Sequence, residues 1–320
     1  LRLRRRGLGV WYQPEAVIVH HLSVTAAKAS PRFKIEQVVR NQQLLSERHQ
    51  DLVDELNQIR LIAFYLPQFH PIPENDRWWG TGFTEWRNVA QARPNFEGHY
   101  QPRLPADLGF YDLRLRETVR QQAALARRYG VYGFCYYYYW FGGQRLLEGP
   151  LEALLGEEPV LPFCLAWANE NWTRSWDGQE SDILMAQRHG DGDDEAVIRD
   201  IVRYMRRPEY IRIGGRPLLL VYRVTLFPDI RRTVALWREV CRKEGLGDIY
   251  LAMVESFGLG RRGSARPQDF GFDAAVEFPP HEAQVPEVLP SQVVNPDFRG
   301  RVFDFRTLVA AYASRPPAGY

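Results

Sequence analysis

From Ile59 onward, short apolar segments alternate with segments of helical length, and this alternation constrains the fold of the 320-residue chain more than any other feature. Strict alternation of apolar and polar residues is missing from the short segments, as expected of parallel strands that are covered on both faces. Strands that alternate with helices favour a parallel α/β fold. Six segments are predicted as strands: Arg60–Leu66, Val131–Tyr138, Val160–Trp167, Pro217–Arg223, Ile249–Glu255 and Asp273–Phe278.

The segments between and after these strands are predicted as helices. They are Leu113–Tyr129, Arg145–Leu155, Glu195–Arg206, Asp229–Glu244 and Phe305–Ala313. Gly130 and Gly245 follow two of them, at the position where a C-cap glycine is expected. The loops after the strands are long and rich in Trp, Asn, Glu and Pro, which favours a (β/α)8 TIM-type barrel with its site at the carboxyl ends of the strands.

An open, doubly wound sheet is the alternative arrangement of the same elements. No glycine-rich loop follows the first strand, so a dinucleotide site is not expected. Six strands are two fewer than a (β/α)8 barrel has, and a barrel that lacks two strands has two unpaired edges. We therefore predict an incomplete barrel over residues 58–320, edged by Arg60–Leu66 and Asp273–Phe278, and interpret the chain as part of a longer polypeptide.

Residues 1–57 differ from the rest and are predicted to form a separate segment. Two short strands are predicted around Pro14, and a polar helix is predicted from Pro31 to about Asn57. Residues 1–60 hold 10 Lys and Arg against 6 Asp and Glu, whereas the remaining residues hold 31 against 33. The excess of basic residues is therefore local, and no nucleic-acid partner is expected.

The cysteines and the hydropathy indicate the cellular compartment in which the protein is expected. Cys135, Cys164 and Cys241 lie far apart inside apolar segments and lack metal-ligand spacing, which indicates buried, reduced thiols and a cytoplasmic protein. No apolar stretch approaches the ~20 residues that a transmembrane helix needs. The histidines also lack metal-ligand spacing, so no cofactor is expected in the barrel.

Aromatic and acidic side chains gather in the loops after the strands. The chain has 9 Trp, 16 Tyr and 17 Phe, and flat rings with a polar edge suit the apolar faces of pyranose sugars. Glu85 follows the first strand and Glu170 the third, and both are candidate catalytic residues because glycoside chemistry uses paired carboxylates. Desolvation beside Trp rings raises the pKa of a carboxyl group, as a general acid requires. Alternatively, Glu170 hydrogen-bonds backbone groups and these loops are purely structural.

Further side chains near the strand ends are predicted to bind the substrate. They are Tyr65, His70, Trp79, Trp86, Tyr138, Trp167, Asn169, Trp172, Arg174, Asp177 and Glu277. Parallel strands bring their carboxyl ends to the same edge of a sheet, so these residues are expected around one pocket. For Arg174 and Asp177, an ion pair that holds the loop is the alternative.

Six segments in order resemble the WbsX-like family, which is related to glycoside hydrolase family 99. They are Phe64–Pro71, Trp79–Val89, Gly98–Pro105, Gly133–Trp140, Trp167–Gly178 and Glu277–His281. Over about residues 59–320, the resemblance implies a barrel enzyme of bacterial surface-polysaccharide biosynthesis, of the O-antigen or capsule type. Such an enzyme transfers or hydrolyses a glycosyl unit in a cleft at the barrel top, and a non-catalytic glycan-binding module is the alternative. The family's Asn-Glu-Trp-x-Glu segment is absent here, so the resemblance implies that the main catalytic pair lies outside this chain and that the chain alone is inactive.

Residues 7–50 resemble the end of a family-2 glycosyltransferase of the GT-A fold, through the segment Tyr12–His21. In an intact GT-A domain, His20 or His21 would help to hold a divalent metal, Mn or Mg. The partners that both resemblances imply are a glycan and a nucleotide-sugar or lipid-linked sugar. The oligomeric state and the identity of the sugar are left open.

Overall fold

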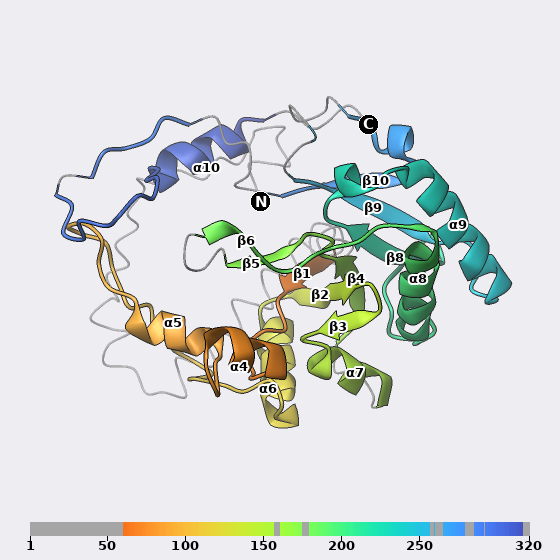
Figure 1. Cartoon of the computed structure of the whole chain (residues 1–320), viewed down its shortest axis with the longest axis horizontal. Helices are drawn as coiled ribbons and strands as arrows, with labels where there is room; N and C mark the ends of the chain where they lie inside the picture. Colours follow the sequence, from red (N-terminus) through yellow and green to blue (C-terminus); the bar gives the residue numbers. More distant parts are fainter. Residues whose placement is uncertain are drawn as a thin grey trace, which may run out of the picture. The chain divides into compact units, whose positions relative to one another are not determined.

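The described part of the chain starts after the predicted N-terminal segment. The computed structural model describes residues 60–156, 161–174, 179–256, 259, 265–278, 285–290 and 292–315 (Figure 1). The predicted segment 1–57, with His20 and His21, therefore lies outside the described residues, and the prediction for it stays a prediction.

Six parallel strands form a curled sheet, which confirms the predicted α/β fold. In sheet order they are β1 (Leu61–Tyr65), β2 (Val131–Phe141), β4 (Phe163–Trp167), β8 (Arg216–Val221), β9 (Tyr250–Glu255) and β10 (Ala274–Glu277). The two end strands are β1 and β10, as predicted. The ring centroids of Phe64 on β1 and of Phe278 just after β10 are 5.3 Å apart, so the curl brings the two ends toward each other and makes a half-barrel.

Short antiparallel strands add to this sheet and correct one prediction. β3 (Gln144–Leu146) pairs with β2, and β7 (Arg212–Ile213) pairs with β8. The helix predicted over Arg145–Leu155 is wrong at its start, because Gly142 and Gly143, at φ 56° and 93°, turn the chain back along β2. The helix α7 (Gly149–Gly156) begins only after this turn. A hairpin of β5 (Trp172–Arg174) and β6 (Gln179–Met185) was not predicted.

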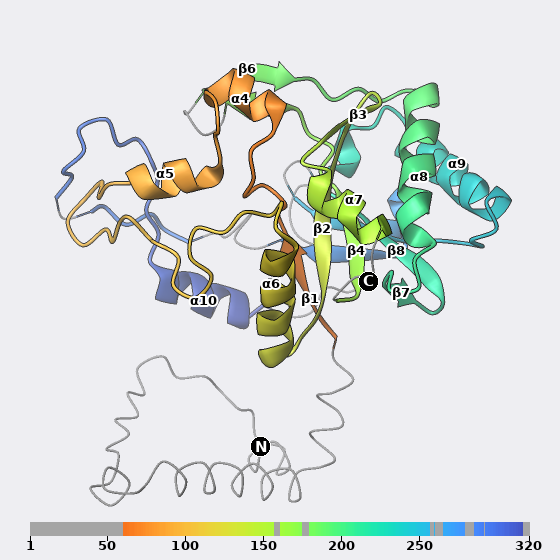
Figure 2. The same cartoon turned by 90° about the horizontal axis from the view of Figure 1, so that it is seen from below.

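Helices cover the outer face of the sheet. They are α6 (Arg116–Arg128), α8 (Asp191–Met205) and α9 (Ile230–Lys243), and Figure 2 shows α6 alongside β1 and β2 and α8 next to α9. In α9, the buried residues Ile230, Val234, Trp237 and Cys241 recur every three to four positions and form one apolar face. Its N-cap is Asp229, whose carboxylate accepts from the Arg232 amide at 3.0 Å.

Two short helices occupy the loop after β1, where none was predicted. They are α4 (Pro73–Trp79) and α5 (Glu85–Gln91). The later helix α10 (Phe305–Ala313) has the predicted bounds. Among the described residues, no helix combines the length and the hydropathy needed to cross a bilayer.

The core lies around β4, where all five residues are buried. One glycine in the neighbouring strand permits this packing. A Cβ atom on Gly133 of β2 would lie 2.4 Å from the carbonyl oxygen of Pro162, so any side chain here would collide with backbone. Close approach of β2 to the chain entering β4 therefore requires this glycine.

The loops that follow the two end strands pair with each other, and we call this pairing the clasp (residues 95–97 and 292–295). The Glu97 amide donates to the carbonyl oxygen of Gln292 at 2.8 Å. The Asn295 amide group donates to the side-chain oxygen of Asn95 at 2.9 Å. In Figure 1 the clasp lies where the orange loop after α5 meets the blue segment before α10. The clasp thus joins loops from opposite ends of the sheet.

Candidate functional site

A pocket of about 480 Å³ opens at the carboxyl ends of the parallel strands. Its position matches the expected place of a barrel site. Its walls combine aromatic rings, amides and one carboxylate. The lining residues are Phe64, Leu66, Gln68, Tyr137, Tyr139, Ala168, Glu170, Asn171, Trp172, Thr173, Tyr222 and Phe278.

Contiguous aromatic rings make most of the pocket wall. The Tyr137 ring stacks on Phe64 at 5.6 Å and on Tyr139 at 6.3 Å between centroids. Trp172 meets Tyr139 edge-on at 5.0 Å. On the other side, Tyr222 meets Phe278 at 5.3 Å. The wall therefore offers several ring surfaces to a ligand with an apolar face.

Burial raises the pKa of the wall tyrosines. The hydroxyls of Tyr137 and Tyr139 both have a pKa well above the ordinary value, first because of desolvation and then because of nearby negative charge. Both hydroxyls are therefore neutral at physiological pH and can donate hydrogen bonds to a ligand.

Glu170 is the carboxylate of the pocket, and it forms an ion pair with Arg223. Two strands bring them together, since Glu170 follows β4 and Arg223 follows β8. The Glu170 side chain remains partly exposed toward the pocket. A charged, oriented hydrogen-bond acceptor therefore stands among the aromatic rings.

Asn169 holds the ends of two neighbouring strands together. Its side chain is fully buried. Its amide nitrogen donates to the carbonyl oxygen of Arg223 at 2.9 Å, and its oxygen accepts from the Arg223 amide at 2.8 Å. On the next strand, the Ser256 hydroxyl donates to the carbonyl oxygen of Tyr222 at 2.6 Å. The buried polar groups thus fix the backbone that carries Tyr222 and Arg223, and Asn169 is not among the residues that line the pocket.

Tyr65 and Tyr138 lie on the opposite face of the sheet from the pocket in which the sequence placed them. The Tyr65 hydroxyl donates to Gln122 of α6 at 2.7 Å. The Tyr138 ring is fully buried, and its hydroxyl donates to Asp200 of α8 at 2.9 Å. Because side chains alternate along a strand, their neighbours Phe64, Tyr137 and Tyr139 face the pocket instead.

Two of the predicted tryptophans pack against other parts of the protein, away from the pocket wall. Trp167 is fully buried, with its ring 5.5 Å from Phe227 and 5.8 Å from Trp237. The Trp86 indole donates to the carbonyl oxygen of Tyr111 at 2.7 Å, which uses its only polar group. Both therefore stabilise the structure and do not line the pocket.

Of the other predicted binding residues whose side chains the structure describes, Trp172 lines the pocket and His70, Trp79 and Glu277 do not. His70 is buried, and its burial lowers the pKa of its imidazole. The Trp79 ring stacks on Phe83 at 5.7 Å, and Glu277 is exposed at the end of β10. The Arg174 side chain and all of Asp177 lie outside the described residues.

Comparison with known proteins places the chain in a family. The model of the family described as glycosyltransferase WbsX matches residues 61–318, which include every strand of the sheet. The chain belongs to the WbsX glycosyltransferase family. The WxcX proteins of two strains of Xanthomonas campestris pv. campestris, B100 and ATCC 33913, are each 55% identical to it over 262 residues. These residues are 81% of the chain, which spans 37% of the length of each relative.

Solved structures similar to this WbsX-family chain include two of the GH99 endo-alpha-mannosidase from Bacteroides thetaiotaomicron. The structure in complex with bis-tris-propane is 17% identical with a TM-score of 0.45, and the alignment covers 68% of this chain and 58% of the mannosidase. The second is 15% identical with a TM-score of 0.41, and the alignment covers 68% and 60% of the two chains.

In the WbsX-family chain, Glu85 lies near the pocket without lining it. It is the first residue of α5, and its carboxylate accepts from the Asn88 side chain at 3.3 Å. Desolvation raises the pKa of the Glu85 carboxyl group above its ordinary value. The negative charges of Glu170 and Glu85 both contribute to the raised pKa of Tyr139, so both carboxylates lie within electrostatic range of this tyrosine.

The raised pKa of Glu85 makes stability depend on pH. The native state holds this proton more tightly than the unfolded state does, so the contribution of Glu85 is favourable at low pH and is lost as the pH rises through the native pKa. Relative to the wild type, Glu85→Gln should therefore gain stability between pH 4 and pH 7, by less than about 1 kcal/mol because the side chain is partly exposed. Urea unfolding of both proteins at the two pH values measures the gain, and a difference independent of pH would contradict it.

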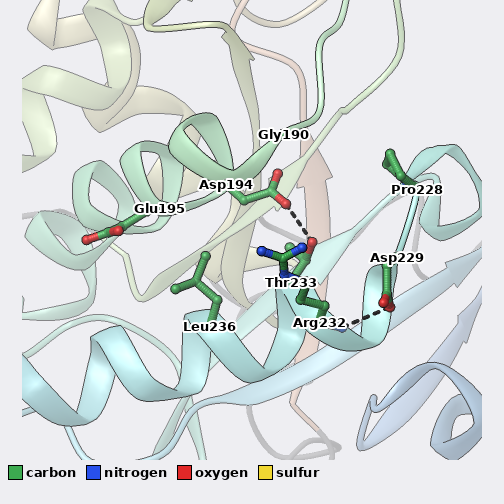
Figure 3. Close-up of a pocket in the computed structure, with 8 residues that line it drawn as sticks. All are labelled: Gly190, Asp194, Glu195, Pro228, Asp229, Arg232, Thr233 and Leu236. Carbon is green, nitrogen blue, oxygen red and sulfur yellow. Dashed lines mark hydrogen bonds between the residues drawn. The ribbon is translucent and has the colours of Figure 1, made fainter.

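A second pocket, of about 280 Å³, lies between the beginnings of α8 and α9 (Figure 3). In it, the Thr233 hydroxyl donates to Asp194 at 2.5 Å, and the Arg232 amide donates to Asp229 at 3.0 Å. These bonds join the two helices and cap one of them. We therefore interpret this pocket as a gap between two packed helices. Within the described residues, no three His, Cys, Asp or Glu side chains are grouped so that they could hold a metal ion.

Proposed function

We propose that this WbsX-family chain is part of a carbohydrate-active enzyme and that the aromatic pocket holds a sugar unit of its glycan substrate. The observation that carries the proposal is the position of Glu170, which is paired with Arg223, within a wall of aromatic rings at the strand ends. Rings stack on the C–H faces of a pyranose, and a carboxylate accepts hydrogen bonds from its hydroxyls. Gln68, Asn171 and Thr173 line the same pocket and add amide and hydroxyl groups.

The reaction we propose is the transfer or the hydrolysis of a glycosyl unit, with Glu170 as the carboxylate that contacts the sugar. Hydrolysis of a glycosidic bond uses a pair of carboxylates around that bond, and transfer to a hydroxyl is helped by a carboxylate that takes up the hydroxyl proton. Glu85, with its raised pKa and its position near Tyr139, is the candidate for a protonated partner. The chain spans 37% of the length of its relatives, and we propose that the full-length protein supplies further catalytic carboxylates.

The biological role that we propose is bacterial surface-polysaccharide biosynthesis in the cytoplasm, with a nucleotide-sugar or lipid-linked sugar as the source of the glycosyl unit. No cofactor is proposed for the barrel. The cytoplasmic location is supported by the thiols: Cys135 and Cys164 stand opposite each other on β2 and β4, and both are free. Such free pairs are typical of a reducing compartment.

Sugar binding tests the proposal. Calorimetric titration with methyl glycosides of glucose, galactose, mannose and rhamnose should find at least one ligand, and Trp172→Ala should weaken its binding about tenfold through the loss of stacking. The control is Tyr129→Ala, because Tyr129 is exposed just before β2 begins, at the other end of the sheet from the pocket. Equal binding by both variants would contradict the site. Binding by the full-length protein without turnover would favour a glycan-binding module.

A further inference from the structure

We propose that a second sugar subsite lies beside the pocket, on Trp78 of α4 and Trp172 of β5, and that the ligand is therefore an oligosaccharide. The inference rests on the proposed function, because Trp172 also lines the pocket. The inference extends the proposed function in two ways: the ligand is longer than one sugar unit, and Trp78, which lies outside the pocket wall, is a further binding residue.

The rings of the two tryptophans continue the aromatic wall without a gap. The centroid of Trp78 lies 6.2 Å from that of Trp172, with 32° between the ring planes. Trp172 in turn lies 5.0 Å from Tyr139 inside the pocket. A sugar chain that places one unit in the pocket therefore meets a further pair of rings at its next unit.

Both indoles are supported from behind and partly open to solvent. They pack against a buried cluster of four residues: Ile72, Phe141, Leu146 and Leu147. Each of the two remains partly exposed. A ring that is held rigidly and left partly uncovered loses little conformational entropy when a ligand stacks on it.

Three tryptophans that pack inside or against the protein use their indole N–H groups in hydrogen bonds, whereas the N–H of the buried Trp167 has no partner. Trp86, Trp140 and Trp237 donate to Tyr111, Asp193 and Asp194, respectively, at 2.7–2.8 Å. Within the described residues, the N–H groups of Trp78 and Trp172 form no such bond. They can therefore donate to the hydroxyl or ring oxygens of a ligand.

Polar groups stand beside Trp78 on the same helix face. Glu74 lies one turn before it, and its carboxylate accepts from the Gln144 side chain at 3.2 Å and pairs with Arg77 at 3.3 Å. A carboxylate and an amide suit sugar hydroxyls. The same carboxylate disfavours a phosphate group, which favours a sugar unit over the base and phosphates of a nucleotide.

The experiment compares ligand lengths by calorimetric titration. Methyl glycosides of glucose, galactose, mannose and rhamnose are titrated beside the corresponding disaccharides. A disaccharide should bind about tenfold more tightly than its unit, and Trp78→Ala should remove this gain without changing the affinity for the single unit. Trp78→Phe keeps a ring and should retain part of the gain, and Tyr129→Ala should retain all of it. Thermal unfolding of each variant shows that it is folded.

Four outcomes would overturn the subsite. If Trp78→Ala weakens the single unit and the disaccharide equally, or if the disaccharide gains nothing in the wild type, the subsite is absent while the proposed function stands. If no sugar of either length binds, the proposed function fails as well. If uridine or guanosine diphosphate binds and Trp78→Ala abolishes this binding, the pair of tryptophans is a nucleotide site.

Discussion

Glu170→Gln should lower glycan turnover by the full-length protein by about 100-fold or more, because an amide neither carries the negative charge nor takes up a proton. The substitution keeps the shape of the side chain and leaves an oxygen that can still accept from Arg223. Sugar affinity should fall less, by about tenfold, since one charged hydrogen bond to a hydroxyl is replaced by a neutral one. Rates with the glycan found by titration, measured beside thermal unfolding, separate the loss of function from the loss of fold.

Glu117→Gln is the matched control for this substitution. Glu117 is an exposed glutamate on α6, on the outer face of the sheet, and its replacement should leave turnover unchanged. Full activity of Glu170→Gln would remove Glu170 from the site, and the ion pair with Arg223 would then be a structural contact between two strand ends.

Trp167→Ala should lower the free energy of unfolding by about 3–5 kcal/mol, the cost of truncating a large buried aromatic side chain. The indole is fully buried between β4 and the helices, against Phe227 and Trp237, so its removal leaves a cavity that rigid neighbours fill only partly. Urea unfolding followed by circular dichroism measures the loss.

Trp172→Ala provides the comparison, because Trp172 is only partly buried and lies at the pocket. It should cost clearly less stability than Trp167→Ala while weakening sugar binding. Similar stability losses in the two variants would show that Trp172 serves the core, and the division between core and pocket tryptophans would be wrong.

The fold could be predicted from the sequence because the strands are short apolar runs separated by helices with clear ends. Phe163–Trp167 and Ile230–Lys243 fall within their predicted ranges for this reason. The elements that escaped prediction depend on local contacts. β3 exists because two glycines reverse the chain onto β2, and α4 and α5 are single short helices in a loop whose composition resembled irregular structure.

For the site, the predicted loops contribute residues to the pocket wall, but several predicted side chains lie on the other face of the sheet. Glu170 and Trp172 line the pocket, whereas Tyr65 and Tyr138 are each one residue away from a residue that does. Strands covered on both faces are apolar on both, so their sequence does not distinguish inward from outward positions. Phe64, Tyr137 and Tyr139 were missed for the same reason. The run of four tyrosines, Tyr136–Tyr139, was the available signal, since two of them had to face each side.

The clasp between the loops after β1 and β10 bears on how this part of the chain folds. Asn95 and Asn295 are 200 residues apart, and the entropy lost on joining two points of an unfolded chain grows with the length between them. Each parallel strand pairs with the one before it in sequence, so successive pairing shortens this separation step by step. We therefore expect the clasp to be a late contact that forms after the rate-limiting step of folding. Its loss should speed unfolding and leave the rate of folding nearly unchanged.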